Sequence, residues 1–494
     1  MARLPAARVP PAALVYNRAI FTPPAPEYVT SPDPTTSTAY EQITGGVYVC
    51  TPDDFNLLTV YVLREQGDWF EDEIKFLRIA LQREANVVDI GANYGCYALT
   101  AAALCSNGRV WAYEPCSTTA EYLRRSVERN GFKNMIVIQA ALSDRPGTGK
   151  LRLQGNSEMN SIGDAADGES SEDITLTTID IERRKRSWPP IDLMKIDAEG
   201  HEPQVIAGGT GFFAEDSPLV MLEIRKVADF DFSPVGPLGE LGYDMYRYVP
   251  ALGVLVPQEP GEPIDNFQLN VFCCKPDRAA DMSSRGLLIP ASEIDIAPLS
   301  PPEGAWRSYL SRFAYTDVLI DSWDRTWSTP ESEIHRRAVD HYAAAMAPEV
   351  ALSQRWAALR ESFALLSNLG ERAPTMPRLV SLARVAAEFG EREKAVAVLK
   401  QILNVYYQSR DVVMGEPFLC PSREFEQIPP GNNMAGWLVC AVLDAYEKRR
   451  TFTSYLLPGA TRAVAKEMRN HGFCTPEIER RETLASLRIG VTAP

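Results

Sequence analysis

Two acidic residues at the ends of consecutive predicted strands have types and spacing suited to chemistry. Asp89 closes an apolar run and is followed by Gly91 and Gly95, four residues apart, before a helical pattern begins. Glycines in such a turn let backbone N–H groups and a helix N-terminus approach a ligand closely. Glu114 ends the next apolar run, where a carboxylate can hold the hydroxyls of a ribose. These residues therefore predict one ligand site at a strand edge.

The residue types also indicate the ligand. The GxxxG spacing differs from the GxGxxG of dinucleotide-binding loops, and an acid ahead of the turn does not suit a phosphate. An acid at this position suits a ligand that carries a cation or an amino group. A ligand with a positive charge, a ribose and no phosphate fits, and S-adenosylmethionine meets that description. The alternative is that Asp89 and Glu114 only cap helices while the glycines turn the chain.

Alternating apolar and helical patterns predict the elements that position these residues. Strands are expected at 86–90, 109–114, 135–142, 191–197 and 218–224, with helices at 95–105, 117–130 and 201–213. Strands that alternate with helices of this length indicate a parallel sheet. The later strands 242–250 and 266–274 have no helix of useful length between them. They predict an antiparallel hairpin at one edge of the sheet.

Several motifs occur in order over about residues 68–275 and carry a family resemblance. They include "VVDIGANYGCYALTAAA", "GRVWAYEPCSTTAEYLRRSVERNG" and "KIDAEGHE". Together they resemble the FkbM-type family of S-adenosylmethionine-dependent methyltransferases, whose signature KxDxEGxE is close to the last motif. The resemblance implies an α/β class I methyltransferase (Rossmann-like) fold. Its sheet would have seven mostly parallel strands and an antiparallel edge hairpin, and an all-α C-terminal domain would follow.

The resemblance also implies a role for individual residues at the S-adenosyl-L-methionine site. Glu114 would accept hydrogen bonds from the ribose hydroxyls, and Ala141 would lie along the adenine through its backbone. Asp197 would contact the methyl-bearing end. The methionine end would be lined by the residues of the glycine turn, with Asp89 supporting it: Gly91, Ala92, Asn93 and Gly95. Tyr94 and Tyr97 either face the sulfonium, where an aromatic ring favours a cation, or belong to the core.

Methyl transfer to a hydroxyl needs an aligned acceptor and a base for the acceptor's proton. Asp197 is the first choice for that base, Glu199 the second, and His201 has the most suitable intrinsic pKa. Asp197 and Glu223 could also hold Mg²⁺, but the sequence places no convincing third ligand, so we predict no metal. The expected acceptor is a hydroxyl of a glycan or a natural product. Residues 155–173 and 228–240 are expected to wall its pocket.

Four parts are predicted along the chain. They are a proline-rich segment (1–45), the methyltransferase domain (46–275), a linker (276–305) and a helical domain (306–494). Within the first domain, "LLTVYVLRE" (57–65) alternates like a strand. Within the helical domain, residues 379–403 faintly resemble a tetratricopeptide-type helix pair that turns at Gly390.

Composition restricts partners and location. A formal net charge of −15 argues against nucleic acid, and nine cysteines without a CxxC pair do not form a disulfide framework. No apolar run is long enough for a membrane span, so a soluble cytoplasmic protein is expected. The helical domain is expected to serve acceptor recognition, homo-oligomerisation or partner binding. The alternative function is a non-catalytic protein that binds adenosylmethionine or acts as a helical scaffold.

Overall fold

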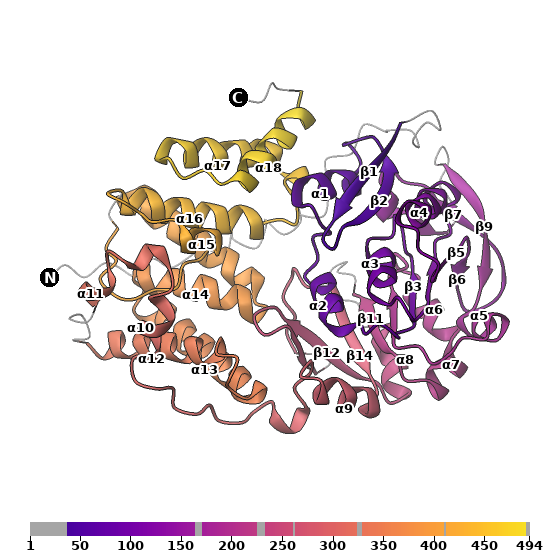
Figure 1. The fold of residues 1–494 in the computed structure, drawn as a ribbon, viewed down its shortest axis with the longest axis horizontal. Helices are drawn as coiled ribbons and strands as arrows, with labels where there is room; N and C mark the ends of the chain where they lie inside the picture. The colour runs from indigo at the N-terminus through magenta and orange to yellow at the C-terminus, as the bar shows by residue number, and fades with distance from the viewer. Residues whose placement is uncertain are drawn as a thin grey trace.

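The computed structural model describes residues 37–163, 170–224, 233–259, 262–323, 329–409 and 412–490. It consists of a sheet domain and a helical domain that lie side by side (Figure 1). Most of the predicted proline-rich segment, residues 1–36, lies outside the described residues. Its last part forms strand β1 (Thr38–Ile43), which pairs antiparallel with β2 (Val47–Pro52).

The central sheet has eight strands rather than the seven expected, in the order β13-β12-β14-β11-β10-β3-β4-β5. Five strands are parallel: β3 (Val87–Ile90), β4 (Val110–Tyr113), β5 (Met135–Ile138), β10 (Leu193–Ile196) and β11 (Leu219–Glu223). The antiparallel edge comprises β12 (Asp244–Val249), β13 (Val254–Pro257) and β14 (Asn270–Cys274). The pairing of β12 with β14 confirms the predicted edge hairpin, and β13 is the strand missing from the prediction.

Helices cover both faces of this sheet because its short strands are apolar on both sides. Along each strand, neighbouring residues enter opposite cores: Val87 packs on one face and Val88 on the other. One core receives α2 (Glu73–Ala80), α3 (Cys96–Leu104) and α4 (Ser117–Asn130). The other receives α5 (Ile179–Arg186), α6 (Glu202–Ala207), α7 (Thr210–Glu215) and α8 (Val235–Glu240). This confirms a class I methyltransferase-like α/β arrangement.

A small second sheet follows β5. It contains β6 (Ala141–Leu142), β7 (Gly147–Arg152), β8 (Ser161–Ile162) and β9 (Ser171–Thr177), in the order β6-β9-β7-β8. A short 3-10 turn (Ser157–Met159) precedes β8. The predicted loop 155–173 is therefore partly regular, and its residues 164–169 lie outside the described part of the chain.

The helical domain begins with α10 (Ala305–Leu310) and α11 (Ile320–Trp323) and continues with longer helices. These are α12 (Pro330–Ala345), α13 (Leu352–Arg372), α14 (Met376–Phe389), α15 (Arg392–Ser409), α16 (Met434–Arg449), α17 (Pro458–His471) and α18 (Pro476–Arg488). Helices α14 and α15 form the predicted pair, with Gly390 at φ 101° in the turn. The predicted linker contains α9 (Pro276–Ser284). Among the described residues, the helices lack the combination of length and apolarity that a membrane span requires.

Two regions join the domains. Val249, Val254 and Val256 of the edge hairpin belong to the apolar core of the helical domain. Away from them, α1 (Leu58–Gln66) packs against α18 (Figure 1). The prediction of a strand at 57–65 is wrong, because these residues form α1.

Candidate active site

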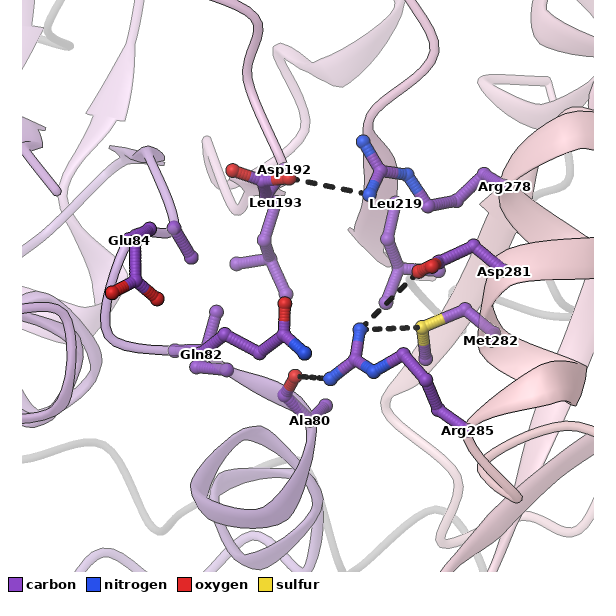
Figure 2. Close-up of a pocket in the computed structure, with 12 residues that line it drawn as sticks. Ala80, Gln82, Glu84, Asp192, Leu193, Leu219, Arg278, Asp281, Met282 and Arg285 are labelled. Atoms are coloured by element: carbon purple, nitrogen blue, oxygen red, sulfur yellow. Dashed lines mark hydrogen bonds and ion pairs between the residues drawn. The ribbon is translucent and has the colours of Figure 1, made fainter.

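A cavity of about 270 Å³ lies at the carboxyl ends of the parallel strands. Its lining includes residues that follow β3, β4 and β10 and the last residue of β11, Glu223, which is where open α/β sheets bind ligands. A second cavity of about 170 Å³ lies at the opposite ends of β10 and β11 (Figure 2). Its arginines are already paired, since Arg278 Nη1 lies 3.2 Å from Asp192 Oδ1 and Arg285 bonds to the Ala80 carbonyl. The first cavity is therefore the candidate active site.

The glycine turn after β3 forms one wall of this cavity. Gly91 has φ 77°, and a Cβ atom there would lie 1.7 Å from the Asp197 carbonyl oxygen. Gly95, at φ 93°, precedes α3, where a Cβ atom would lie 2.2 Å from Leu123 Cδ1. Asn93 between them has φ 49°, a conformation that is uncommon for a residue with a side chain. The turn therefore needs both glycines, and it sets the cofactor wall directly against the end of β10.

Replacing Gly91 by Ala is expected to destabilise the chain by on the order of 3 kcal/mol. The added methyl group would force the turn away from the Asp197 carbonyl, so binding of S-adenosylhomocysteine should weaken as well. Thermal unfolding and calorimetric titration measure the two effects. Gly131→Ala is the matched control, because Gly131 also has positive φ but a Cβ atom there meets open space. Equal effects of the two substitutions would contradict the conclusion that the turn requires glycine at position 91 because of the Asp197 carbonyl.

Glu114 lies at the end of β4 with both carboxylate oxygens held by the backbone. Oε2 accepts from the N–H of Asn93 at 2.9 Å, and Oε1 accepts from the N–H of Cys116 at 2.9 Å. Burial raises the pKa of Glu114 to about 7, although these two N–H groups lower it. Ala92 and Ala141 line the same part of the cavity. The structure therefore brings together the residues predicted to hold the ribose and the adenine.

Asp89 lies inside β3 and is 1% exposed. Neither of its carboxylate oxygens has a hydrogen-bond partner among the described residues. Burial raises its pKa to about 6, with nearby Asp197 adding to the rise and Lys195 opposing it. A buried carboxylate without a donor calls for an explanation. The amino group of S-adenosylmethionine would supply such a donor, so this residue fits the predicted cofactor.

Lys195 of β10 is the one cationic side chain among the described residues that line the cavity. Its Nζ atom lies 2.6 Å from Asp197 Oδ2 and 5.0 Å from the centroid of the Tyr97 ring. Burial by itself would lower the pKa of Lys195, but the charges of Asp197, Asp89 and Glu71 raise it above its ordinary value. Lys195 therefore stays charged and orients Asp197. The sequence analysis gave it no role, although it is the first residue of the "KIDAEGHE" motif.

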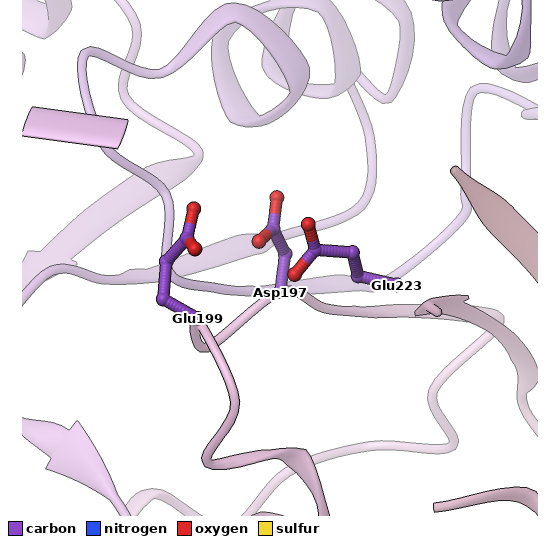
Figure 3. Close-up of side chains that lie close together, drawn as sticks. All are labelled: Asp197, Glu199 and Glu223. Atoms are coloured by element: carbon purple, nitrogen blue, oxygen red, sulfur yellow. The ribbon is translucent and has the colours of Figure 1, made fainter. Parts of the chain in front are cut away.

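Three carboxylates meet at the edge of the cavity: those of Asp197, Glu199 and Glu223 (Figure 3). Each offers an oxygen atom within 4.8 Å of the others. Burial and the charge of Asp197 raise the pKa of Glu223 well above its ordinary value. The group could hold a divalent cation or share protons. We predicted no metal because no third ligand was evident, and that premise is wrong because Glu199 supplies one.

The two glutamates and the histidine of the "KIDAEGHE" motif differ in their position relative to the cavity. Glu199 has φ 53° and lines the cavity, which is consistent with a functional position that holds backbone strain. His201 is outside the lining, with Nε2 2.9 Å from Ser143 Oγ, and burial lowers its pKa. This position argues against the catalytic role predicted for it. Glu202 instead accepts from the N–H groups of Ala198 and Gly200 and so fixes the turn.

Residues before the first parallel strand and in the small sheet close the cavity. Part of the predicted pocket wall does so, namely Ser157, Glu158, Asn160 and Ile162. Ser157 Oγ donates to Asn93 Oδ1 at 2.9 Å. Residues 228–232 lie outside the described part of the chain, and 233–240 are not in the lining. Sequence reasoning missed further lining residues, because they come from segments outside the recognised motifs; among them are Thr59, Trp69, Phe70 and Glu71.

The acidic lining makes the folding stability of the ligand-free chain depend on pH. Burial raises the pKa of Glu158 to about 7, as it does that of Glu114, whereas an unfolded carboxyl titrates near about 4. Between these values the folded state retains protons that the unfolded state has lost. The contribution of these groups to stability is therefore present at low pH and is lost as pH rises through about 7.

We expect the melting temperature of the ligand-free chain to fall between pH 5 and pH 8, and less steeply in the double variant Glu114→Gln with Glu158→Gln. Thermal scans across this range measure the slope. Glu172→Gln is the control for the general effect of removing one negative charge, because Glu172 bonds to the Ser117 N–H outside the cavity lining. An unchanged slope in the double variant would contradict the assignment of the dependence to the cavity.

Comparison with known proteins assigns the domain. The model of the family described as "Methyltransferase FkbM domain" matches residues 89–254. A search of curated proteins found no match. A solved structure of methyltransferase FkbM from Methylobacillus flagellatus KT is similar at 14% identity and a TM-score of 0.28. The match covers 39% of this chain and 44% of that protein, which is less than half of its length.

Two other solved structures have similar sequence identities and TM-scores. The O-methyltransferase from Bacillus cereus in complex with SAH has 14% identity and a TM-score of 0.25, over 45% of this chain and 90% of that one. TYW2 of M. jannaschii in complex with AdoMet has 14% identity and a TM-score of 0.26, over 50% and 87%. The family match spans the glycine turn, Glu114 and the acidic cluster. Residues 89–254 thus match the methyltransferase FkbM domain, the family that the sequence motifs resemble.

Proposed function

We propose that the chain transfers the methyl group to a hydroxyl of a carbohydrate, either a glycan or a sugar-bearing natural product. The observation that carries this proposal is the position of Asp197. Its carboxylate lies at the end of β10, lines the cavity beside the glycine turn, and is held by Lys195 at 2.6 Å. A fixed carboxylate at the edge of the cofactor cavity can act as the base that a hydroxyl acceptor requires.

The charge of the cavity restricts the acceptor. Seven carboxyl groups line it, those of Glu71, Asp89, Glu114, Glu158, Asp197, Glu199 and Glu223, against the single cation Lys195. An acceptor that carries a phosphate or a carboxylate would be repelled. An amine would be attracted, but negative surroundings raise its pKa and keep the attacking lone pair protonated. A neutral hydroxyl avoids both problems, which supports O-methylation.

The apolar part of the lining supports a sugar as the carrier of that hydroxyl. The rings of Trp69 and Phe70 lie 4.7 Å apart at the cavity and offer apolar surface. Carboxylates of Glu71 and Glu223 lie in the same lining and accept hydrogen bonds. Apolar rings combined with several acceptors suit a ligand that has many hydroxyls and C–H faces.

In this mechanism the chain's own residues align the acceptor and take up its proton. When bound, S-adenosylmethionine would supply a methyl group on a sulfonium, and its sulfur would depart as a neutral thioether when the acceptor oxygen takes that methyl group. Asp197 would take up the proton that the acceptor hydroxyl gives up. Lys195 holds the Asp197 carboxylate in place through an ion pair of 2.6 Å, and neighbouring carboxylates raise the pKa of Lys195 above its ordinary value, which favours its charged form.

The test is to incubate the full chain with S-adenosylmethionine carrying a labelled methyl group and a panel of acceptors. Neutral mono- and oligosaccharides, amines and sugar phosphates represent the three acceptor classes. Label transfer to the neutral sugars supports the proposal, and transfer to amines or sugar phosphates overturns it. Tight cofactor binding without transfer to any acceptor class would favour the alternative of a non-catalytic adenosylmethionine-binding scaffold.

A further inference from the structure

One segment of the helical domain reaches the walls of the active-site cavity. It is the connection between α16 and α17, residues 451–456, which we call the clasp. The clasp lies where the two domains meet near α1, at the top of Figure 1. It is not itself part of the lining. The clasp nevertheless contacts three stretches of the chain that contribute residues to that lining or lie next to it.

The first contact is with α1. The Ser454 N–H donates to Glu65 Oε1 at 2.9 Å, and Ser454 Oγ lies 2.8 Å from the Tyr61 hydroxyl. Glu65 is fully buried, so its carboxylate depends on these partners. The Phe452 carbonyl also accepts from Gln66 Nε2 at 2.7 Å. These bonds hold the C-terminal half of α1, whose first residues line the cavity.

The second contact is aromatic. The Phe452 ring lies between Phe70, at 4.9 Å, and Phe267, at 5.8 Å between ring centroids. The Arg392 guanidinium lies 4.6 Å from the Phe452 ring and 4.8 Å from the Phe267 ring. Phe70 lines the cavity, and so does Leu269, two residues after Phe267. A side chain of the helical domain thus separates and supports two lining segments.

The third contact is at the start of α1. The Tyr455 hydroxyl donates to the Asn56 carbonyl at 2.7 Å and lies 3.5 Å from Asn156 Nδ2. Asn156 Oδ1 in turn accepts from the N–H of Leu58 at 2.8 Å. Tyr455 therefore touches the point where α1 and the turn that carries Glu158 are joined. The Arg488 guanidinium covers its ring at 3.4 Å, which fixes the hydroxyl in place.

We propose that Phe452 and Tyr455 are positioning residues for the methyltransferase site, and that through them the helical domain sets the shape of the cavity. The wall segments are short and come from loops and helix ends, which seldom hold a fixed geometry without support. The cofactor turn and Glu114 belong to the sheet domain, whereas the opposite wall depends on the clasp. This assigns the helical domain a part in the site.

The experiment measures S-adenosylhomocysteine binding and amide hydrogen exchange on the full chain with Phe452→Ala and Tyr455→Phe. We expect affinity to fall about tenfold in the first variant and about threefold in the second. Exchange should accelerate at 56–60 and 156–160 and stay unchanged in β3 and α3. Tyr455→Phe removes only the hydroxyl, so it remains informative if Phe452→Ala lowers overall stability. Because no acceptor is used, the result is independent of the proposed O-methylation.

The control is Arg247→Met at the other junction between the domains. Arg247 Nη1 donates to the Phe389 carbonyl at 2.8 Å, and the residue is not part of the cavity lining. This variant is expected to lower the melting temperature without changing ligand affinity or exchange in the wall segments. The proposal is overturned if the clasp variants leave affinity and wall exchange unchanged. It is also overturned if Arg247→Met reproduces their effects, because a general loosening of the domains would then suffice.

Discussion

Asp197→Asn is expected to reduce methyl transfer by about 100- to 10,000-fold while leaving S-adenosylhomocysteine affinity within about threefold. An amide cannot take the acceptor's proton, but it keeps the size and the backbone of the strand end. Lys195 loses its nearest partner in this variant, yet Asp89 and Glu71 still favour its charge. The rate of labelled methyl transfer to the responding acceptor and a calorimetric titration give the two quantities.

Glu223→Gln is the matched comparison for this result. Burial and neighbouring acids raise the pKa of Glu223 well above its ordinary value, which favours the protonated form that glutamine imitates. We therefore expect a loss of less than about tenfold. A larger loss from Glu223→Gln than from Asp197→Asn would show that the roles of the two carboxyl groups are reversed. Equal and small losses would exclude both residues as the base.

Glu114→Ala is expected to weaken S-adenosylhomocysteine binding by about 100-fold or more. The resemblance to the FkbM-type family predicts that this carboxylate accepts hydrogen bonds from the ribose hydroxyls, and bonds to a charged group contribute about 1.5–3 kcal/mol each. The substitution also leaves the N–H groups of Asn93 and Cys116 without their acceptor. Isothermal titration with S-adenosylhomocysteine measures the loss directly.

Glu172→Gln provides the control for Glu114→Ala. Glu172 accepts from the Ser117 N–H at 3.1 Å, at the start of the helix that follows Glu114, but it does not line the cavity. Its substitution should change affinity by less than about threefold. Unaltered binding in Glu114→Ala would mean that the ligand lies elsewhere, and comparable losses in both variants would indicate a disturbed helix rather than a lost ribose contact.

The sequence predicts which residues gather at the centre of this site, because they follow strands that are neighbours in the sheet, β10, β3 and β4. Gly91, Glu114 and Asp197 lie at carboxyl ends of parallel strands, which meet at one edge of a sheet. Residues such as Thr59 and Glu71 were missed because their positions depend on tertiary packing. They come from the start of α1 and from a segment before α2. Neither location follows from the pattern of the chain around them.

Helix α1 illustrates the same limit for the fold. Its residues Thr59 to Leu63 are all almost fully buried, since α1 packs against both the sheet domain and the helical domain. A helix that is buried on every side lacks the polar face that reveals a period of 3.6 residues. The alternation of side-chain types that remains in residues 57–65 resembles that of a strand.

The shared core at the edge hairpin affects the order in which the chain can fold. Val249, Val254 and Val256 leave the ribosome well before the helices against which they pack. Until those helices are synthesised, the nascent sheet domain presents an apolar strand edge to water, which is a site prone to association with other chains. We therefore expect the two domains to unfold cooperatively at this edge and the last strands to pack fully only after the C-terminal helices emerge.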